Sequence, residues 1–91
     1  MHALPLPGTL DRKAASELAR LLLECRGTDA ALDAAEVGRV SAPALETLIS
    51  ARNQWRADGR TLTVINPSPA FLAGIEGLGA SMRMLQTGGA T

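Results

Sequence analysis

Aromatic residues are almost missing from this sequence: Trp55 and Phe71 are the only two, and there is no tyrosine. Such a chain lacks the series of rings on which single-stranded nucleic acid or sugars stack. Cys25 is the single cysteine, which excludes an intramolecular disulfide and a thiolate metal cluster. It follows three leucines closely, so we expect a buried, inert thiol.

An excess of charge of either sign is also lacking. Nine basic and nine acidic residues cancel and are interspersed, which argues against a nucleic-acid-binding protein. No apolar run approaches the ~20 residues that cross a bilayer, and the start of the chain does not have the pattern of a signal peptide. We therefore expect a cytoplasmic protein without direct membrane insertion.

The order of elements predicts an α/β fold. Strand and helix patterns alternate along the chain, which is typical of right-handed crossovers in a mostly parallel sheet. The expected elements are a short edge strand at 3–6, a helix at 11–26, an alanine-rich strand at 30–34, a helix from 41 to 59, a strand at 60–66 and a helix from 68. We predict one domain over 1–91, with a small mixed, mostly parallel sheet covered by helices, a core at about 4–79 and a flexible tail at about 86–91.

Helix starts and buried faces can be read from residue types and spacing. Asp11 or Thr9 is expected to cap the first helix, and Ser68 before Pro69 to cap the third. The residues expected on buried helix faces are Ala15, Leu18, Ala19, Leu22 and Cys25, widened by Leu21 and Leu23, then Leu45, Leu48, Ile49 and Trp55, and finally Phe71, Ile75 and Leu78. The residues expected on the solvated face of the second helix are Ser50, Arg52, Asn53 and Arg56.

Residue patterns for catalysis or cofactor binding are weak. The sole histidine, His2, lies near the chain start, and no metal-ligand spacing occurs. Asp33 and Glu36 could form a carboxylate pair, but capping or solvated groups explain them better. Glycines at 74, 77 and 79 follow no strand, so close packing and a helix end are favoured over a phosphate loop. We expect no enzyme activity, no metal and no cofactor.

Ser41 lies where an apolar loop leads into the second helix. A serine at this place caps a helix by accepting from amides of its first turn. The same position would also stabilise a phosphate, because a helix N-terminus is partly positive. Both interpretations, a cap alone and a regulatory hydroxyl, remain open from the residues.

The stretch LDAAEVGRVSAPALETLISA, at residues 32–51, resembles the STAS domains, the group of bacterial anti-sigma-factor antagonists. The later stretch LTVINPSPAFLAGIEGLG, at 62–79, is similar to the last strand, loop and helix of that family. The resemblance spans about Leu4 to Gly79. It implies the STAS fold and a non-enzymatic role in signal transduction and transcription regulation, in which binding a serine kinase or anti-sigma factor frees a sigma factor.

The family's regulated hydroxyl positions correspond here to Ala42 and Pro43, and its aspartate corresponds to Ser41. This chain departs from the family pattern there, and Ser41 becomes the candidate for phosphorylation. The expected partner contacts are Val40, Ser41, Ala42, Pro43 and Leu45. By the same resemblance, the alternative partners are the ATPase of a phospholipid-trafficking ABC transporter and a chemotaxis kinase. A small-ligand or nucleotide site has the least support, because no convergent polar groups are visible.

Overall fold

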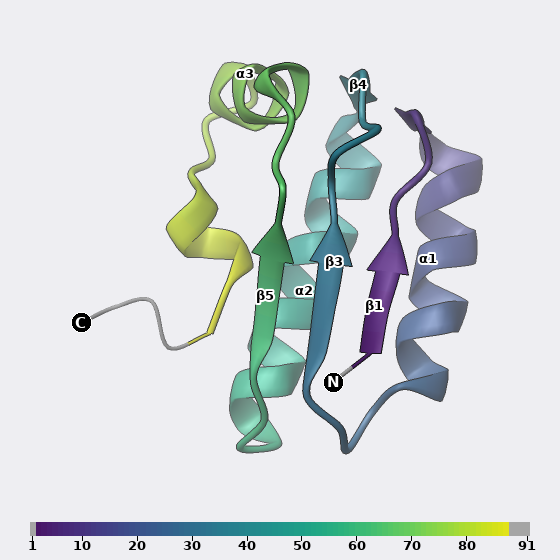
Figure 1. Ribbon diagram of the computed structural model, residues 1–91, viewed down its shortest axis with the longest axis vertical. Coiled ribbons are helices and arrows are strands. Elements are labelled where there is room, and N and C mark those ends of the chain that lie inside the picture. The colour runs from purple at the N-terminus through teal and green to yellow at the C-terminus, as the bar shows by residue number, and fades with distance from the viewer. Residues whose placement is uncertain (1, 88–91) are drawn as a thin grey trace.

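The computed structural model describes residues 2–87 of the chain (Figure 1). The strands are β1 (His2–Pro5), β2 (Thr9–Leu10), β3 (Ala30–Asp33), β4 (Arg39–Val40) and β5 (Leu62–Ile65). The helices are α1 (Arg12–Glu24), α2 (Ala42–Ala57), α3 (Pro69–Gly77) and the short 3-10 helix η1 (Met82–Leu85). The predicted alternation of strands and helices is confirmed.

The main sheet has the strand order β1-β3-β5. Every pairing in the described part of the chain is parallel, with Leu4 opposite Leu32 and Leu32 opposite Val64. β3 lies in the centre, where Ala30 and Leu32 are fully buried. Position therefore overrides the weak strand propensity of its alanines, because a central strand is paired on both sides.

Helices α1 and α2 run side by side on one face of the sheet (Figure 1). The buried side chains of this layer pack on β3 and β5, and Trp55 is 2% exposed. The indole Nε1 of Trp55 donates a hydrogen bond of 2.8 Å to the carbonyl of Thr28. Each buried large apolar side chain contributes about 1.5–3 kcal/mol to folding. No helix among the described residues has the length and apolarity to cross a membrane.

Several predicted core positions are wrong. Leu78 is 43% exposed, because α3 ends at Gly77 and Gly79 turns the chain with φ +86°. Leu23 is 67% exposed, because its neighbour Leu22 takes the side of α1 that faces the core. The remaining departures are smaller: Ala19 is exposed, and Leu21, Cys25 and Ile49 are half-buried.

Both edges of the main sheet are protected. Along β1 the amide of Leu6 donates to the carbonyl of Asp33, so the alternate residues Ala3 and Pro5 direct their backbone groups outward. Pro5 has no N–H to offer a further strand. Along β5 the amide of Val64 donates to Gln86 Oε1 and that of Leu62 to Thr87 Oγ1, at 2.9 and 2.8 Å.

Gln86 and Thr87 correct the expected tail. We predicted a flexible segment from about residue 86 and a core that stops at about 79. Instead these two residues bind the edge of β5, and Leu85 is completely buried. A polar segment rich in glycine does not show by its composition that two of its side chains occupy a sheet edge. Residues 88–91 lie outside the described part.

Candidate functional site

Ser41 caps α2. Its backbone is extended, its Oγ accepts from the amide of Ala44 at 3.3 Å, and its own amide donates to the carbonyl of Leu10 at 2.8 Å. Pro43 falls in the first turn, where the missing N–H costs nothing. Asp11 caps α1 in the same manner, accepting from Ala14 at 2.8 Å, so Asp11 rather than Thr9 is the cap.

A two-stranded parallel pair, β2 with β4, holds these two helix starts next to each other. Thr9 lies opposite Arg39 and Leu10 opposite Val40. A hollow of about 260 Å³ lies between the starts of α1 and α2, and both caps, Asp11 and Ser41, are among its lining residues. The sequence did not predict this pair, because two-residue strands are too short to show the alternation of a strand.

Helix α3 lies next to β4 and contacts it (Figure 1). A Cβ placed on Gly74 would lie 3.2 Å from Val40 Cγ2, so the glycine allows close approach. Ser68 accepts from the amide of Phe71 at 3.0 Å and donates its hydroxyl to the carbonyl of Val37 at 2.5 Å. The predicted Ser68 cap and the packing explanation of Gly74 are confirmed, and the loop before α2 is held by several elements.

The exposure of the predicted contact residues differs. Ala42 is exposed, and Val40, Ser41 and Pro43 are half-buried. Leu45 is only 6% exposed and belongs to the core, so little of its side chain is available to a partner. The apolar spacing that places Leu45 on the buried face of α2 also removes it from the surface.

The whole of this arrangement lies within the match to one family model. The model described as "Mlab, STAS domain" matches residues 2–86. This chain belongs to the STAS domain family. No curated protein and no solved structure matches it. The family match and the parallel α/β architecture confirm the resemblance and the fold class that the sequence indicated.

The outer side of α2 in this STAS domain is mostly solvated, as predicted. Ser50, Asn53 and Arg56 are exposed. Arg52 differs, because it is half-buried and its Nε is buried with no hydrogen-bond partner in the described part of the chain. At the end of α2, Asp58 accepts two hydrogen bonds of 3.2 Å from the Arg26 guanidinium, which lower the pKa of that carboxyl, and one from Gln54 lowers it further.

The two carboxylates considered for catalysis, Asp33 and Glu36, have different surroundings. Asp33 Oδ1 accepts from the amide of Ala35 at 3.0 Å, which is the capping role favoured from sequence, and Glu36 is exposed. Among residues 2–87, no three His, Cys, Asp or Glu side chains gather where they could hold a metal ion. The feature that distinguishes the start of α2 is a loop whose backbone is held in place by hydrogen bonds.

Proposed function

We propose that this STAS domain is a non-enzymatic, cytoplasmic module that binds a kinase-type or ATPase-type protein through its loop surface. The loop surface comprises Arg39, Val40, Ser41, Ala42 and Pro43. The observation that carries the proposal is that Ala42 is exposed while the backbone of the loop before it is held by three contacts. Leu10 accepts from the Ser41 amide, Val40 packs under α3, and Oγ of Ser41 binds the first turn of α2.

A preorganised loop of this kind suits partner binding, because little conformational entropy is lost when the partner docks. Its side chains other than Arg39 are small, and Arg39 supplies its only formal charge. A partner would therefore recognise shape, with few charged contacts. This fits membership of a family of interaction domains better than it fits turnover of a small substrate.

We further propose that binding does not depend on phosphorylation. The family's hydroxyl positions hold Ala42 and Pro43, and the remaining hydroxyl of Ser41 already accepts from Ala44. A phosphate on Ser41 would add nearly two negative charges to a surface that otherwise carries one positive charge. The presence of Ala42 and Pro43 at the family's hydroxyl positions favours the second candidate, a permanently bound transporter ATPase or chemotaxis kinase. It disfavours a serine kinase that releases the domain on modifying it.

The test is affinity capture of partners from the native cell, with and without Mg-ATP, followed by mass spectrometry of both partner and Ser41. We expect one ATPase-type or kinase-type protein in equal yield under both conditions, with Ser41 unmodified. Phosphorylated Ser41 together with loss of the complex in ATP would contradict permanent binding and establish a switch. Failure to capture any such protein would contradict the proposed function itself.

A further inference from the structure

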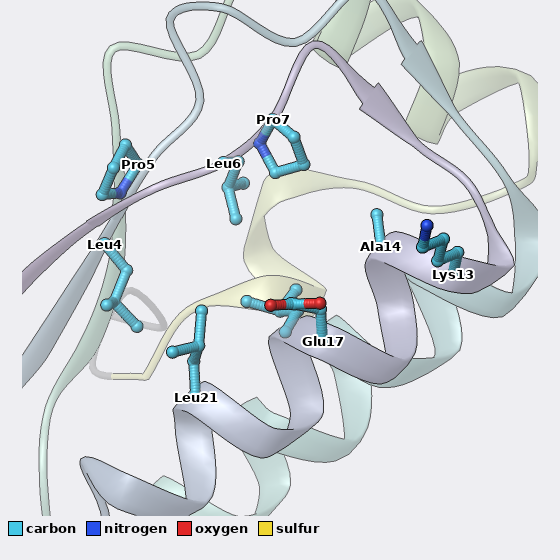
Figure 2. A pocket seen from close by; sticks show the side chains of 9 residues that line it. Leu4, Pro5, Leu6, Pro7, Lys13, Ala14, Glu17 and Leu21 are labelled. Atoms are coloured by element: carbon cyan, nitrogen blue, oxygen red, sulfur yellow. The ribbon is translucent and has the colours of Figure 1, made fainter.

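An apolar groove lies between the first strand and the first helix (Figure 2). Leu4 of β1 and Leu21 of α1 flank it at one end, and Pro7 and Ala14 lie at the other. Nearly all the groove surface is aliphatic, and its charged groups, Lys13 and Glu17, stand on successive turns of α1. The groove has a volume of about 260 Å³.

Size and polarity decide what kind of occupant fits. Pockets that hold small-molecule ligands enclose about 300–1,000 Å³ and add a few convergent polar groups that fix orientation. This groove is smaller, and no buried polar side chain points into it. A partner strand is also disfavoured, because Pro5 removes an outward N–H from the adjacent edge of β1. One large apolar side chain is the occupant that matches.

The charges at the rim add a second requirement. Glu17 is already paired with Arg20 at 3.2 Å, and Arg20 also binds Glu24 at 3.0 Å. Lys13 and its neighbour Arg12 form no ion pair within the described residues. Both cations also lie in the first turn of α1, where the helix dipole is positive. Lys13 therefore offers an acidic group a positive charge at the rim that no carboxylate of the described residues pairs with.

The groove and the hollow beside Ser41 are both lined in part by residues at the start of α1. Asp11 lines the hollow beside Ser41, and Lys13 and Ala14, only two and three residues later, line the groove. We propose that the groove receives an apolar side chain of the partner, from a segment in which acidic residues flank that side chain. This inference rests on the proposed function, because one partner would cover both surfaces.

A photo-reactive phenylalanine analogue placed in the full chain tests this inference. It replaces Pro7 in the groove in one variant, Ala42 on the loop surface in a second, and Ser16 in a third. Ser16 is exposed on α1 and lines neither hollow, so it serves as the control. After irradiation in the native cell, mass spectrometry identifies the attached protein and the attached peptide. Thermal unfolding of each variant confirms that it folds.

We expect the Pro7 and Ala42 positions to capture the same protein and the Ser16 position to capture none. The peptide attached at Pro7 should contain a large apolar residue flanked by Asp or Glu. Lys13→Glu should lower the Pro7 yield about fivefold, whereas Lys13→Arg should preserve it. Ala14→Leu, which fills the groove, should lower that yield about tenfold, and Ser16→Leu should not.

Each other outcome has a definite meaning. Capture at Ala42 without capture at Pro7 would overturn the groove inference and leave the proposed function standing. A neutral or basic peptide at Pro7, a peptide from a second copy of this chain, or a yield that Lys13→Glu does not change would also overturn it. Absence of capture at Ala42 would contradict the proposed function, whatever is found at Pro7.

Discussion

Gly74 of α3 lies directly against Val40 of β4: a Cβ on the glycine would come within 3.2 Å of Val40 Cγ2 and 3.3 Å of Val40 Cβ. Valine is stiff at χ1, so it cannot move aside by a simple rotation. The contact joins α3 to the strand that precedes Ser41. The position of the loop surface therefore depends on α3 as well as on α2.

Gly74→Ala should destabilise the protein by about 1 kcal/mol, because overpacking costs about 1–3 kcal/mol and the gain in helix propensity returns at most about 1 kcal/mol. Urea unfolding measures the change. Gly77→Ala is the matched control, since nothing lies within 4 Å of a Cβ there, and it should be neutral or stabilising. Val40→Ala removes the Cγ2 contact but keeps Cβ at 3.3 Å, so it should relieve part of the cost of Gly74→Ala in a double-mutant cycle. No relief at all would show that the contact is not the cause.

Ser68→Ala should cost more stability than Ser41→Ala. Loss of a serine cap costs about 1 kcal/mol, which is the expected effect at Ser41. At Ser68 the hydroxyl also donates to the carbonyl of Val37, so its removal leaves that acceptor unpaired and should bring the total to about 2 kcal/mol. Urea unfolding of both variants gives the comparison. Equal losses would show that the Val37 hydrogen bond contributes nothing to stability. Ser41→Asp, which keeps a capping oxygen, should be more stable than Ser41→Ala.

Gln86→Ala should open the outer edge of β5. The Gln86 side chain accepts from the amide of Val64 at 2.9 Å, so its removal leaves that amide to water and should cost about 1 kcal/mol. Hydrogen exchange measured by NMR should show faster exchange at Val64 and little change in β1. Arg83→Ala, on the exposed side of η1, is the control. Unchanged protection of Val64 in Gln86→Ala would contradict the edge contact.

Arg26→Ala should raise the pKa of Asp58, because the hydrogen bonds from Arg26 are the main cause that lowers it from its usual value of 3.8. A carboxyl whose pKa is lowered by folding adds stability above its unfolded pKa and loses it as pH falls through the folded value. As the pH falls below about 4, the free energy of unfolding of the wild type should therefore decrease more than that of Arg26→Ala. NMR titration of the Asp58 carboxyl measures the pKa, with Arg60→Ala as the control. An unchanged titration would refute the assignment.

The sequence predicted those parts of the fold that depend on local chemistry. The helix starts were predicted from residues whose side chains can cap a helix, namely Asp11, Ser41 and Ser68. The alternation of strand and helix patterns predicted the parallel sheet. Leu78 shows the limit of periodicity, because the helix ends one residue before it. The helical spacing that predicted Leu45 as core also leaves little of its side chain for contact with a partner.

What the sequence could not predict depends on contacts between distant segments. The pairing of Thr9 with Arg39 joins two-residue strands that carry no periodic signal. The binding of Gln86 to Val64 fixes a segment whose composition is that of a loose tail. The groove beside β1 likewise depends on how α1 packs against β1 and the segment after it, which lie in separate parts of the sequence.

The most direct test of the account compares two charge substitutions on α2. Ala42 is exposed at the start of the helix on the loop surface, and Asn53 is exposed three turns later, outside it. Partner capture from the native cell is quantified for Ala42→Glu, Asn53→Glu and the wild type, after circular dichroism shows equal helix content. We expect Ala42→Glu to lose about nine-tenths of the captured partner, equivalent to about 1.4 kcal/mol, and Asn53→Glu to keep it. Equal capture by both variants would contradict docking at the start of α2.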